Sequence, residues 1–600
     1  MRLTNEQIAA ATEGQTVATL FRDVVTGHGD QVALRWQDGD GWQEMTYAQY
    51  GDAATRLATA LTGLGIGRGD RVALMLRNRP EFHVADVACV LVGATPISIY
   101  NSSSPDQVAY LMGHAGVVAA IAEDETFLSR ILSVRDELPK LRELVVVEPP
   151  ATGADGVHVW SELLASEPGD LEALAAIAQP TDLATVIYTS GTTGPPKGVM
   201  LDHANVAWTV KCTRETLGAD VDGSRIVSYL PMAHIAERNV SHYGGIAFHY
   251  AVTTCPEPGK VAQYLPQVRP HVFFAVPRVW EKIHAGVLAM ASADPARQAQ
   301  LEAALEVGLK VSDHRARREE LPADLAAAWA EADTGLSAVR ALLGLDACIA
   351  AVSGAAPIAV EIFDFFRGLG VPLSEVYGMS ESTGLMTWDP FEIRAGTVGR
   401  AVPGLELTLA EDGEVICRGG DVFRGYLDDP EKTAEALDAD GWLHSGDIGV
   451  IDDDGYLRIV DRKKELIITA GGKNISPSNL ESSLKAQLLI GQACVIGDQR
   501  PFMSALVVLD PDTAPAWAKQ HGIEATSLAE LADHAEVRAE VDREVEASMA
   551  SYNNAERVKK VVVLHDEWLP DSEELTPTSK LKRRGIHAKY AQEIESIYAR

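Results

Sequence analysis

Short apolar runs rich in β-branched residues alternate along this chain with longer stretches rich in alanine and leucine. The strand candidates are RVALML (71–76), LVVV (144–147), ATVIY (184–188), IVSYL (226–230), HVFFAV (271–276) and CIAAVSG (348–354). Apolar runs of this length are typical of strands that are buried on both faces and covered by helices. The pattern therefore predicts an α/β protein with stacked, mostly parallel sheets and covering helices.

Two regions depart from this alternation. Residues 285–345 contain few strand formers, so we expect a helical insertion that Pro322 divides into at least two helices. From residue 461 onward, short strands mix with helices, as in a small α+β domain. We expect a large N-terminal domain over residues 1–461 and a small C-terminal domain over residues 462–600.

The chain is strongly acidic. Its 600 residues include 52 Lys plus Arg and 85 Asp plus Glu, which gives a formal net charge of −33 at pH 7. A surface of this sign repels nucleic acid and anionic lipid heads at long range. We therefore expect no nucleic-acid partner, although a local basic pocket for one nucleotide is compatible with this charge.

The cysteine pattern and the start of the chain favour a cytoplasmic protein. The six cysteines form no CxxC pair or zinc-like cluster, so we expect buried thiols in a reducing compartment. The start lacks the apolar segment of a signal peptide, and Asp86, Gly93 and Pro96 interrupt the most apolar stretch (84–100). Peripheral membrane contact stays open, as does the oligomeric state, a homodimer included.

A loop rich in hydroxyls and glycines, YTSGTTGPPKG (188–198), directly follows the strand candidate ATVIY. Glycines let backbone N–H groups approach phosphate oxygens, hydroxyls donate further hydrogen bonds, and lysine adds a positive charge. The spacing is not that of a Walker A loop, which disfavours a P-loop kinase or ATPase. The candidate phosphate-binding residues are Thr189, Ser190, Gly191, Thr192, Thr193, Gly194 and Lys197.

This loop resembles the phosphate-binding signature of the AMP-forming adenylating superfamily, which includes acyl-CoA synthetases, peptide-synthetase adenylation domains and beetle luciferases. Further segments resemble the family's motifs in the family's order. They are SGAAP (353–357), YGMSEST (377–383), WLHSGD (442–447), DRKK (461–464) and TSKLK (578–582). Their joint occurrence by chance is negligible, and they extend over almost the whole chain.

The resemblance implies how the nucleotide and its metal are held. Tyr377 would stack on adenine, Asp447 would accept both ribose hydroxyls, and Glu381 with Thr189 would bind Mg²⁺. One carboxylate and one hydroxyl suit Mg²⁺, which keeps phosphate and water oxygens as its other ligands. The remaining residues implied around the nucleotide are Gly354, Ala355, Ala356, Pro357, Gly378, Met379 and Ser380.

The resemblance also implies that the C-terminal domain is mobile. Arg462 would contact the nucleotide, and Lys464 would be the hinge pivot, with the adjacent Lys463 as an alternative. The loop TAGGKN (469–474), with Gly471, Gly472 and Lys473, would swing into the active site and help form the thiol channel. Lys580 stands where the family keeps its catalytic adenylation lysine, and Ser579 before it replaces the more common Gly or Leu.

The acyl substrate is indicated by two further segments. YLPMAH (229–234) places His234 at a family position that gates the acyl pocket, and VFFAVPRVWEKI (272–283) with the insertion resembles the long-chain fatty acyl-CoA synthetase branch. Trp280 is a wall of the acyl tunnel or a core residue. The resemblance implies adenylation of a long-chain fatty acid by MgATP, followed by transfer to coenzyme A.

Several alternatives share these residues. A fatty acyl-AMP ligase would deliver the acyl group to a carrier protein, and a medium-chain or aryl acid–CoA ligase would differ only in its acyl pocket. A luciferase-like oxygenase uses the same adenylation residues, and the long insertion argues against it. A regulatory protein without catalysis is disfavoured because no catalytic residue of the pattern is missing.

Overall fold

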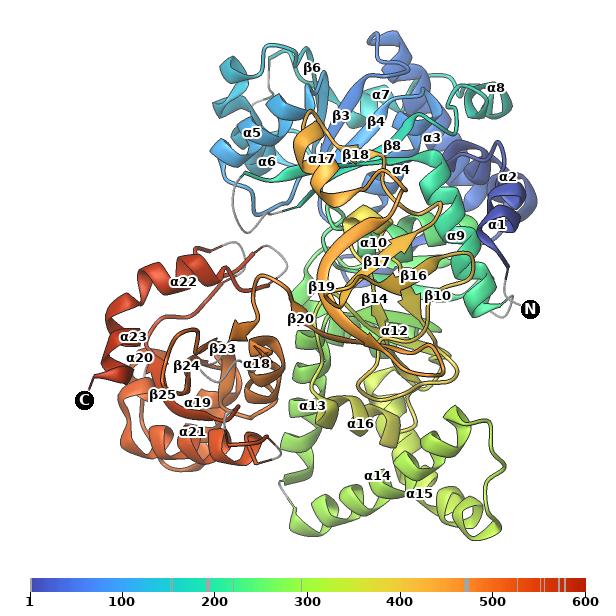
Figure 1. Cartoon of the computed structure of the whole chain (residues 1–600). Coiled ribbons are helices and arrows are strands. Elements are labelled where there is room, and N and C mark those ends of the chain that lie inside the picture. The colour runs from blue at the N-terminus through green and yellow to red at the C-terminus, as the bar shows by residue number, and fades with distance from the viewer. Residues whose placement is uncertain are drawn as a thin grey trace.

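The computed structural model describes residues 3–151, 153, 155–189, 195–218, 221–292, 294–468, 474–525, 527–550, 552–554, 556–569, 572–576 and 579–599. The helices and strands form a large N-terminal part and a smaller C-terminal part that lies beside it (Figure 1). No helix of these ranges is long and apolar enough to cross a membrane.

The predicted α/β class is confirmed, and parallel sheets form much of the N-terminal part. One sheet has the order β4-β3-β5-β6-β7 with all strands parallel. Its strands are β3 (Arg71–Met75), β4 (Thr95–Ser98), β5 (Ala119–Ala122), β6 (Glu143–Val146) and β7 (His158–Val159). Around it lie α3 (Tyr47–Gly63), α4 (Pro80–Leu91), α5 (Pro105–Ala115) and α6 (Glu125–Ser133). Every residue of α4 except Glu81 is buried, so this helix lies inside the protein.

Two further sheets mix parallel and antiparallel pairs. The first, in the order β10-β11-β1-β2, contains β1 (Val32–Asp38), β2 (Gly41–Thr46), β10 (Arg225–Ser228) and β11 (Ala251–Thr254). The second contains β12 (Val272–Ala275), β13 (Ala350–Ser353), β14 (Leu373–Tyr377) and β15 (Thr387–Trp388) in sequence order. In the second, only the pair β14–β15 is antiparallel. The other helices of this region include α2 (Val17–His28), α9 (His203–Leu217), α12 (Val261–Val268) and α16 (Val360–Gly368).

The strand candidate ATVIY differs from the parallel pattern. It lies in β8 (Leu183–Thr189), which pairs antiparallel with β9 (Lys197–Asp202), and β18 (Gly425–Tyr426) adds to the other edge of β9. Another sheet is fully antiparallel and consists of β16 (Glu406–Leu409), β17 (Glu414–Arg418), β19 (Leu443–Ile451) and β20 (Leu457–Arg462). Its last strand leads toward the C-terminal part (Figure 1).

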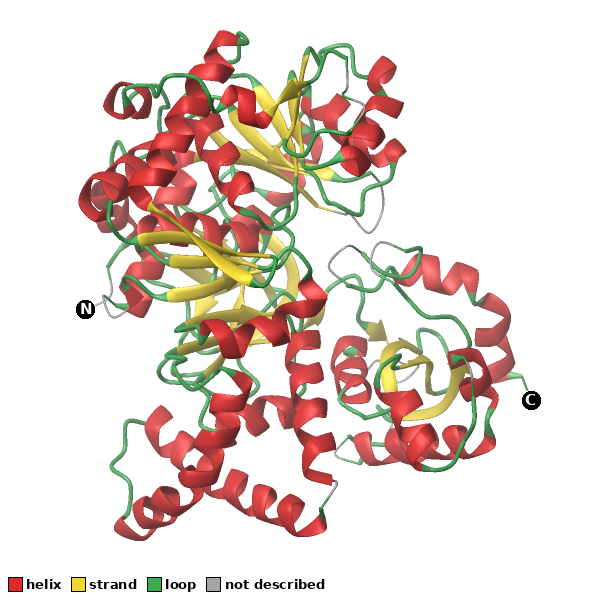
Figure 2. Ribbon diagram, turned by 180° about the vertical axis from the view of Figure 1, so that it is seen from behind, coloured by secondary structure: helices red, strands yellow, loops and turns green. Residues whose placement is uncertain are grey.

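The predicted helical insertion is present. It consists of α13 (Pro277–Ser292), α14 (Pro295–Ala316) and α15 (Ala323–Leu343), with Pro322 as the N-cap of α15. α14 packs against both α15 and α16. The insertion projects from the end of the N-terminal part opposite the β3 sheet (Figures 1 and 2).

The C-terminal part is an α+β unit. Its sheet joins β23 (Ile490–Ile496), β24 (Met503–Leu509) and β25 (Val558–Leu564), the last pair parallel. Around it lie α18 (Pro477–Lys485), α19 (Thr513–Gln520), α20 (Leu528–Asp533), α21 (Ala535–Ser548), α22 (Arg583–Lys589) and α23 (Ala591–Tyr598). A short antiparallel pair, β21 (Ile467–Ile468) and β22 (Asn474–Ile475), precedes α18.

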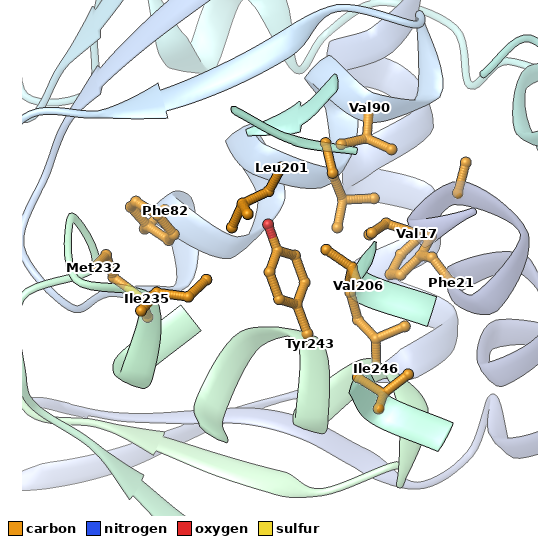
Figure 3. Packing of buried hydrophobic residues seen from close by; sticks show 14 of the residues in the cluster. Val17, Phe21, Phe82, Val90, Leu201, Val206, Met232, Ile235, Tyr243 and Ile246 are labelled. Atoms are coloured by element: carbon orange, nitrogen blue, oxygen red, sulfur yellow. The ribbon is translucent and has the colours of Figure 1, made fainter. Parts of the chain in front are cut away.

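Large hydrophobic clusters underlie the N-terminal part. Figure 3 shows the ring of Tyr243 between Phe82, Ile235 and Val206, side chains that come from segments far apart in the sequence. The cysteines follow the predicted pattern: all six are free, Cys348 is half-buried, and the other five are buried.

Candidate functional site

The hairpin β8–β9 places Thr189 directly opposite Lys197. The two residues are cross-strand partners at the end of the hairpin, so the glycine-rich loop lies between two antiparallel strands. Residues Ser190, Gly191, Thr192, Thr193 and Gly194 of that loop lie outside the described residues. Lys197 is half-buried, and burial lowers the pKa of its ammonium.

Tyr426 connects Lys197 with Glu381. The Nζ atom of Lys197 lies 3.8 Å from the centre of the Tyr426 ring, within cation–π distance. The Tyr426 hydroxyl donates a hydrogen bond of 2.7 Å to Oε1 of Glu381. Sequence analysis missed Tyr426, because FRGYL (423–427) carries no chemical signature and only the pairing of β18 with β9 brings it here.

Glu381 lies in a tightly folded segment after β14. The glutamate is 6% exposed. A Cβ added at Gly378 would lie 2.4 Å from the carbonyl oxygen of Gly384, so the chain approaches itself too closely there for any other residue. Thr383 adopts a left-handed backbone with φ +50°. The sequence YGMSEST thus forms a compact turn that holds one buried carboxylate.

This carboxylate suits Mg²⁺. The hydroxyl of Tyr426 donates to one oxygen of this carboxylate, and carboxylate oxygens are among the ligands that Mg²⁺ prefers. In the described ranges, no group of three or more His, Cys, Asp or Glu side chains could hold a metal. Mg²⁺ is often held by one protein carboxylate together with phosphate and water oxygens, and Glu381 would supply that carboxylate.

The two segments predicted to surround adenine leave neighbouring parallel strands. Gly354, Ala355, Ala356 and Pro357 follow β13, and Tyr377 ends β14, which pairs with β13. Side chains beyond the carboxyl ends of adjacent parallel strands meet at one edge of a sheet. A Cβ at Gly354 would lie 2.8 Å from Cγ1 of Val376, which explains the glycine. Met379 and Ser380 begin the next turn.

Tyr377, Asp447 and Arg462 form a second contact group. Asp447 and Arg462 are cross-strand partners on β19 and β20, with Nε of Arg462 3.7 Å from Oδ1 of Asp447. The Tyr377 hydroxyl donates a 2.6 Å hydrogen bond to Oδ2 of Asp447. Burial raises the pKa of Asp447, and the Arg462 guanidinium and the Tyr377 hydrogen bond partly oppose it.

Lys580 comes to this group from the C-terminal part. It lies in a tight turn in which its N–H donates to Oγ1 of Thr576 at 3.0 Å and its carbonyl accepts from the Thr576 N–H at 2.8 Å. Ser579 before it has a left-handed backbone with φ +60°. The pKa of Lys580 is lowered to about 8, mainly by burial and next by Arg462, while Asp447 and Glu381 raise it.

His234 also lies close to Lys580. Burial and then the Lys580 charge lower the pKa of His234 to about 3, so its ring is neutral at physiological pH. Its Nδ1 atom accepts a 3.2 Å hydrogen bond from the N–H of Ala236, which caps the helix α10 (Ile235–Glu237). The structure therefore brings a neutral imidazole to the lysine.

A fully buried polar cluster anchors the segment after His234. A π-helix, Arg238–Tyr243, follows α10, and such helices are often found at functional sites. Arg238 forms a salt bridge with Asp86, and His242 bonds the same carboxylate at 2.9 Å. Asn239 donates to the carbonyl of Thr383, which ties this helix to the Glu381 turn.

Trp280 lies in the core. It is 0% exposed, with ring centres 5.3 Å from Phe273 and 4.8 Å from Phe366 in edge-to-face contacts. Its Nε1–H has no hydrogen-bond partner among the described atoms. Of the two roles left open for Trp280, this packing favours the core residue.

In the DRKK segment, Asp461 is buried and the three basic residues after it are exposed. Lys463 forms salt bridges with Asp412 and with Glu414, the latter at 3.2 Å. Lys464 is exposed. Asp461 accepts a 2.6 Å hydrogen bond from Ser476, the N-cap of α18. Gly471, Gly472 and Lys473 lie outside the described residues.

The predicted site residues therefore gather from both parts of the chain. Lys197 contacts Tyr426, which bonds Glu381, and Thr189 lies opposite Lys197. Tyr377, Asp447 and Arg462 form the other contact group, with which Lys580 interacts through its charge. Charge interaction between Lys580 and Glu381 connects the two. Trp280 stands apart, in the aromatic core.

Two known protein families match the sequence of this chain. Residues 21–427 match the AMP-binding enzyme family, and residues 464–600 match the AMP-binding enzyme C-terminal domain. The chain belongs to the AMP-binding enzymes. The predicted resemblance is thus confirmed at the level of the family.

Two relatives among the AMP-binding enzymes match at considerable identity. The putative fatty-acid–CoA ligase fadD11 of Mycobacterium tuberculosis is 44% identical over 455 residues, which is 74% of this chain and 79% of the relative. The long-chain-fatty-acid–CoA ligase FadD15 of Mycobacterium bovis is 36% identical over 582 residues, which is 93% of this chain and 92% of the relative.

Solved AMP-binding structures share the fold. The A domain of carboxylic acid reductase from Segniliparus rugosus, solved with AMP and a co-purified carboxylic acid, has a TM-score of 0.76 and 20% identity. That comparison covers 99% of this chain and 96% of the other. At this identity, the likeness supports the arrangement of sheets and helices alone.

Proposed function

We propose that this chain is an ATP-dependent long-chain-fatty-acid–CoA ligase that forms an acyl-AMP and then an acyl-CoA. The observation that carries the proposal is the charge interaction of Lys580, from the C-terminal part, with Asp447 and Glu381 of the N-terminal part and with Arg462 at the domain border. The names of the relatives support a fatty acid as the acid and coenzyme A as the acceptor.

In the first half-reaction, a carboxylate oxygen of the acid attacks the α-phosphorus of ATP. The new O–P bond gives the acyl-AMP, the bond to the bridging oxygen breaks, and pyrophosphate leaves. Negative charge grows on the α-phosphoryl oxygens and the leaving group, and cations fixed in advance lower this barrier. Lys580 would stabilise the α-phosphoryl oxygens, and Lys197 with the 189–194 loop would hold the other phosphates.

The same residues would orient the nucleoside. Asp447 would accept the ribose hydroxyls, Arg462 would contact the nucleotide, and Tyr377 would pack its ring on adenine beside residues 354–357. Glu381 and Thr189 would hold Mg²⁺, which when bound neutralises charge on the phosphates. Tyr426 would keep the Glu381 carboxylate oriented through its 2.7 Å hydrogen bond.

In the second half-reaction, the coenzyme A thiol attacks the acyl carbonyl and AMP leaves. We place the domain border at residues 461–462 and the hinge pivot at Lys464, so that rotation would withdraw Lys580 and present the 469–474 loop with Gly471, Gly472 and Lys473. The salt bridges of Lys463 with Asp412 and Glu414 favour the neighbouring Lys464 as the pivot. Neutral His234 beside Lys580 would border the acyl entrance.

The deciding experiment is acid-dependent ATP–pyrophosphate exchange with fatty acids from C8 to C24, followed by thioester formation with coenzyme A. We expect exchange that is strongest with long chains, and acyl-CoA as the product. Exchange without thioester formation would contradict the ligase, and absence of exchange with every fatty acid would contradict the substrate class.

A further inference from the structure

The segment PRVWEK (277–282) has a role that the adenylation chemistry does not explain. It forms the first turns of α13, the helix that runs along the side of the N-terminal part facing the C-terminal part (Figures 1 and 2). Trp280 points into the aromatic core, with Phe366 4.8 Å away. Arg278 lies two residues before Trp280 and Lys282 two residues after it. Both contact the C-terminal part instead.

Two salt bridges cross from α13 to the turn between β24 and α19. Arg278 binds Asp510, and Nζ of Lys282 lies 2.7 Å from Oδ2 of Asp512. The first pair is well shielded, since the Asp510 side chain is 7% exposed and the Arg278 side chain 26%. The second pair is exposed on both sides, so it contributes little by comparison.

Asp510 is held rigidly on its own side of the contact. Its Oδ1 atom accepts hydrogen bonds from the N–H groups of Asp512 at 3.0 Å and Thr513 at 2.9 Å. Burial alone would raise the pKa of Asp510, but Arg278 and these N–H groups hold it below its usual range. On the other side, Oε2 of the buried Glu281 lies 3.3 Å from Arg278 and fixes the guanidinium.

We infer that the Arg278–Asp510 pair, aided by Lys282–Asp512, docks the C-terminal part in the orientation that puts Lys580 beside Asp447. Few other described contacts cross at this place: Oγ of Ser482 donates to the carbonyl of Pro357 at 3.3 Å, and Ala486 packs on the core around Trp280. Both are weak, and the hydrogen bonds of Asp461 with Ser476 and Ser478 lie beside the hinge. The shielded ion pair is therefore the contact that fixes the orientation away from the hinge. Arg278 is a positioning residue, and it acts through Lys580.

This inference rests on the proposed adenylation, and its test separates the two half-reactions. Arg278→Gln should lower acid-dependent ATP–pyrophosphate exchange at least tenfold, because Lys580 no longer stays in place. Thioester formation from supplied acyl-AMP and coenzyme A should stay within twofold, because that step does not use Lys580. Asp510→Asn, which keeps the acceptor for the two N–H groups, should give the same pattern, and the double variant should lose no more than either single one.

Arg400→Gln is the matched control. Arg400 pairs with Asp389 inside the N-terminal part, and the two side chains are 26% and 7% exposed, as in the Arg278 pair. Arg400→Gln should not lower the rate of one half-reaction more than that of the other. Equal loss of both half-reactions in Arg278→Gln, or the same selective loss in Arg400→Gln, would overturn the inference.

A second measurement is independent of activity. Labels are attached at Glu302→Cys on α14 and Glu536→Cys on α21, two exposed positions, in a Cys348→Ser background. Energy transfer between the labels reports the distance between the N-terminal and C-terminal parts. Arg278→Gln should broaden and shift this distance, whereas Arg400→Gln should not. An unchanged distance would overturn the docking role even if exchange is lost, and a changed distance would support it even if no fatty acid is activated.

Discussion

The Tyr426 hydroxyl donates a 2.7 Å hydrogen bond to the Glu381 carboxylate while the Tyr426 ring lies against the Lys197 ammonium. One aromatic side chain thus positions both charges that would hold the metal and the phosphates. The two contacts can be removed separately, because the hydroxyl makes the hydrogen bond to Glu381 and the ring makes the cation–π contact with Lys197.

Tyr426→Phe should weaken metal binding and adenylation. A hydrogen bond to a charged group contributes about 1.5–3 kcal/mol, so we expect the adenylation rate to fall about tenfold or more and the Mg²⁺ requirement to rise. Tyr426→Leu also removes the ring and should lose about another twofold to fivefold. Exchange measured against Mg²⁺ concentration, together with Mn²⁺ binding followed by paramagnetic resonance, tests this. Equal Mn²⁺ affinity in Tyr426→Phe and the wild type would disprove it.

Lys580→Ala should abolish adenylation and largely spare thioester formation from supplied acyl-AMP. Removal of one charge-stabilising group typically costs about 10²–10³ in rate. Lys582→Ala is the matched control, because Nζ of Lys582 donates to the Ser572 carbonyl at 2.8 Å, within the C-terminal part. Equal loss of both half-reactions in Lys580→Ala would refute the assigned role.

Adenylation should decline as the pH rises through about 8. The pKa of Lys580 is lowered to about 8, so the free enzyme carries the needed ammonium below that pH and loses it above. This decline is the alkaline limb of the pH profile. It should appear in kcat/KM for ATP, which reports the free enzyme. In kcat it should lie at higher pH, because bound phosphates raise the pKa of the ammonium. Lys580→Arg should remove the limb, and a limb that persists in this variant would assign it to another group.

Ser579 should be replaceable by glycine and not by a β-branched residue. Its φ of +60° is a backbone region that costs an L-residue about 1 kcal/mol and glycine very little. Ser579→Gly should keep adenylation and slightly stabilise the turn. Ser579→Val should displace the adjacent Lys580 and lower adenylation more than thioester formation. Equal exchange rates in the two variants would show that the turn does not position the lysine.

Trp280→Phe should change stability and not chain-length preference. The indole is buried between Phe273 and Phe366, and its N–H has no described partner, so phenylalanine loses volume but no hydrogen bond. We expect the free energy of unfolding to fall by about 1–2 kcal/mol, as for a small new cavity. Denaturant unfolding and exchange rates from C8 to C24 measure the two effects. A shift in the preferred chain length would show that Trp280 lines the acyl tunnel.

The family and the chemistry of the site could be predicted from local sequence. Motifs such as YGMSEST and TSKLK act through close backbone turns, and the structure has those turns at Gly378 and around Lys580. The insertion was also predictable, because its composition suits helices and Pro322 interrupts it. ATVIY was read correctly as a strand, but its antiparallel partner β9 did not follow from its apolar run.

Sequence alone determined which residues carry charge and where the chain turns, because short-range backbone chemistry depends on neighbouring residues. Only the tertiary structure decided which distant segments meet. Tyr426 lies 45 positions from Glu381, and Asp510 lies 232 positions from Arg278. Such contacts depend on strand pairing and on how the two parts of the chain pack, which the periodicity of one segment does not encode. The same holds for PRVWEK, where one helix turn divides its side chains between the core and the docking contact.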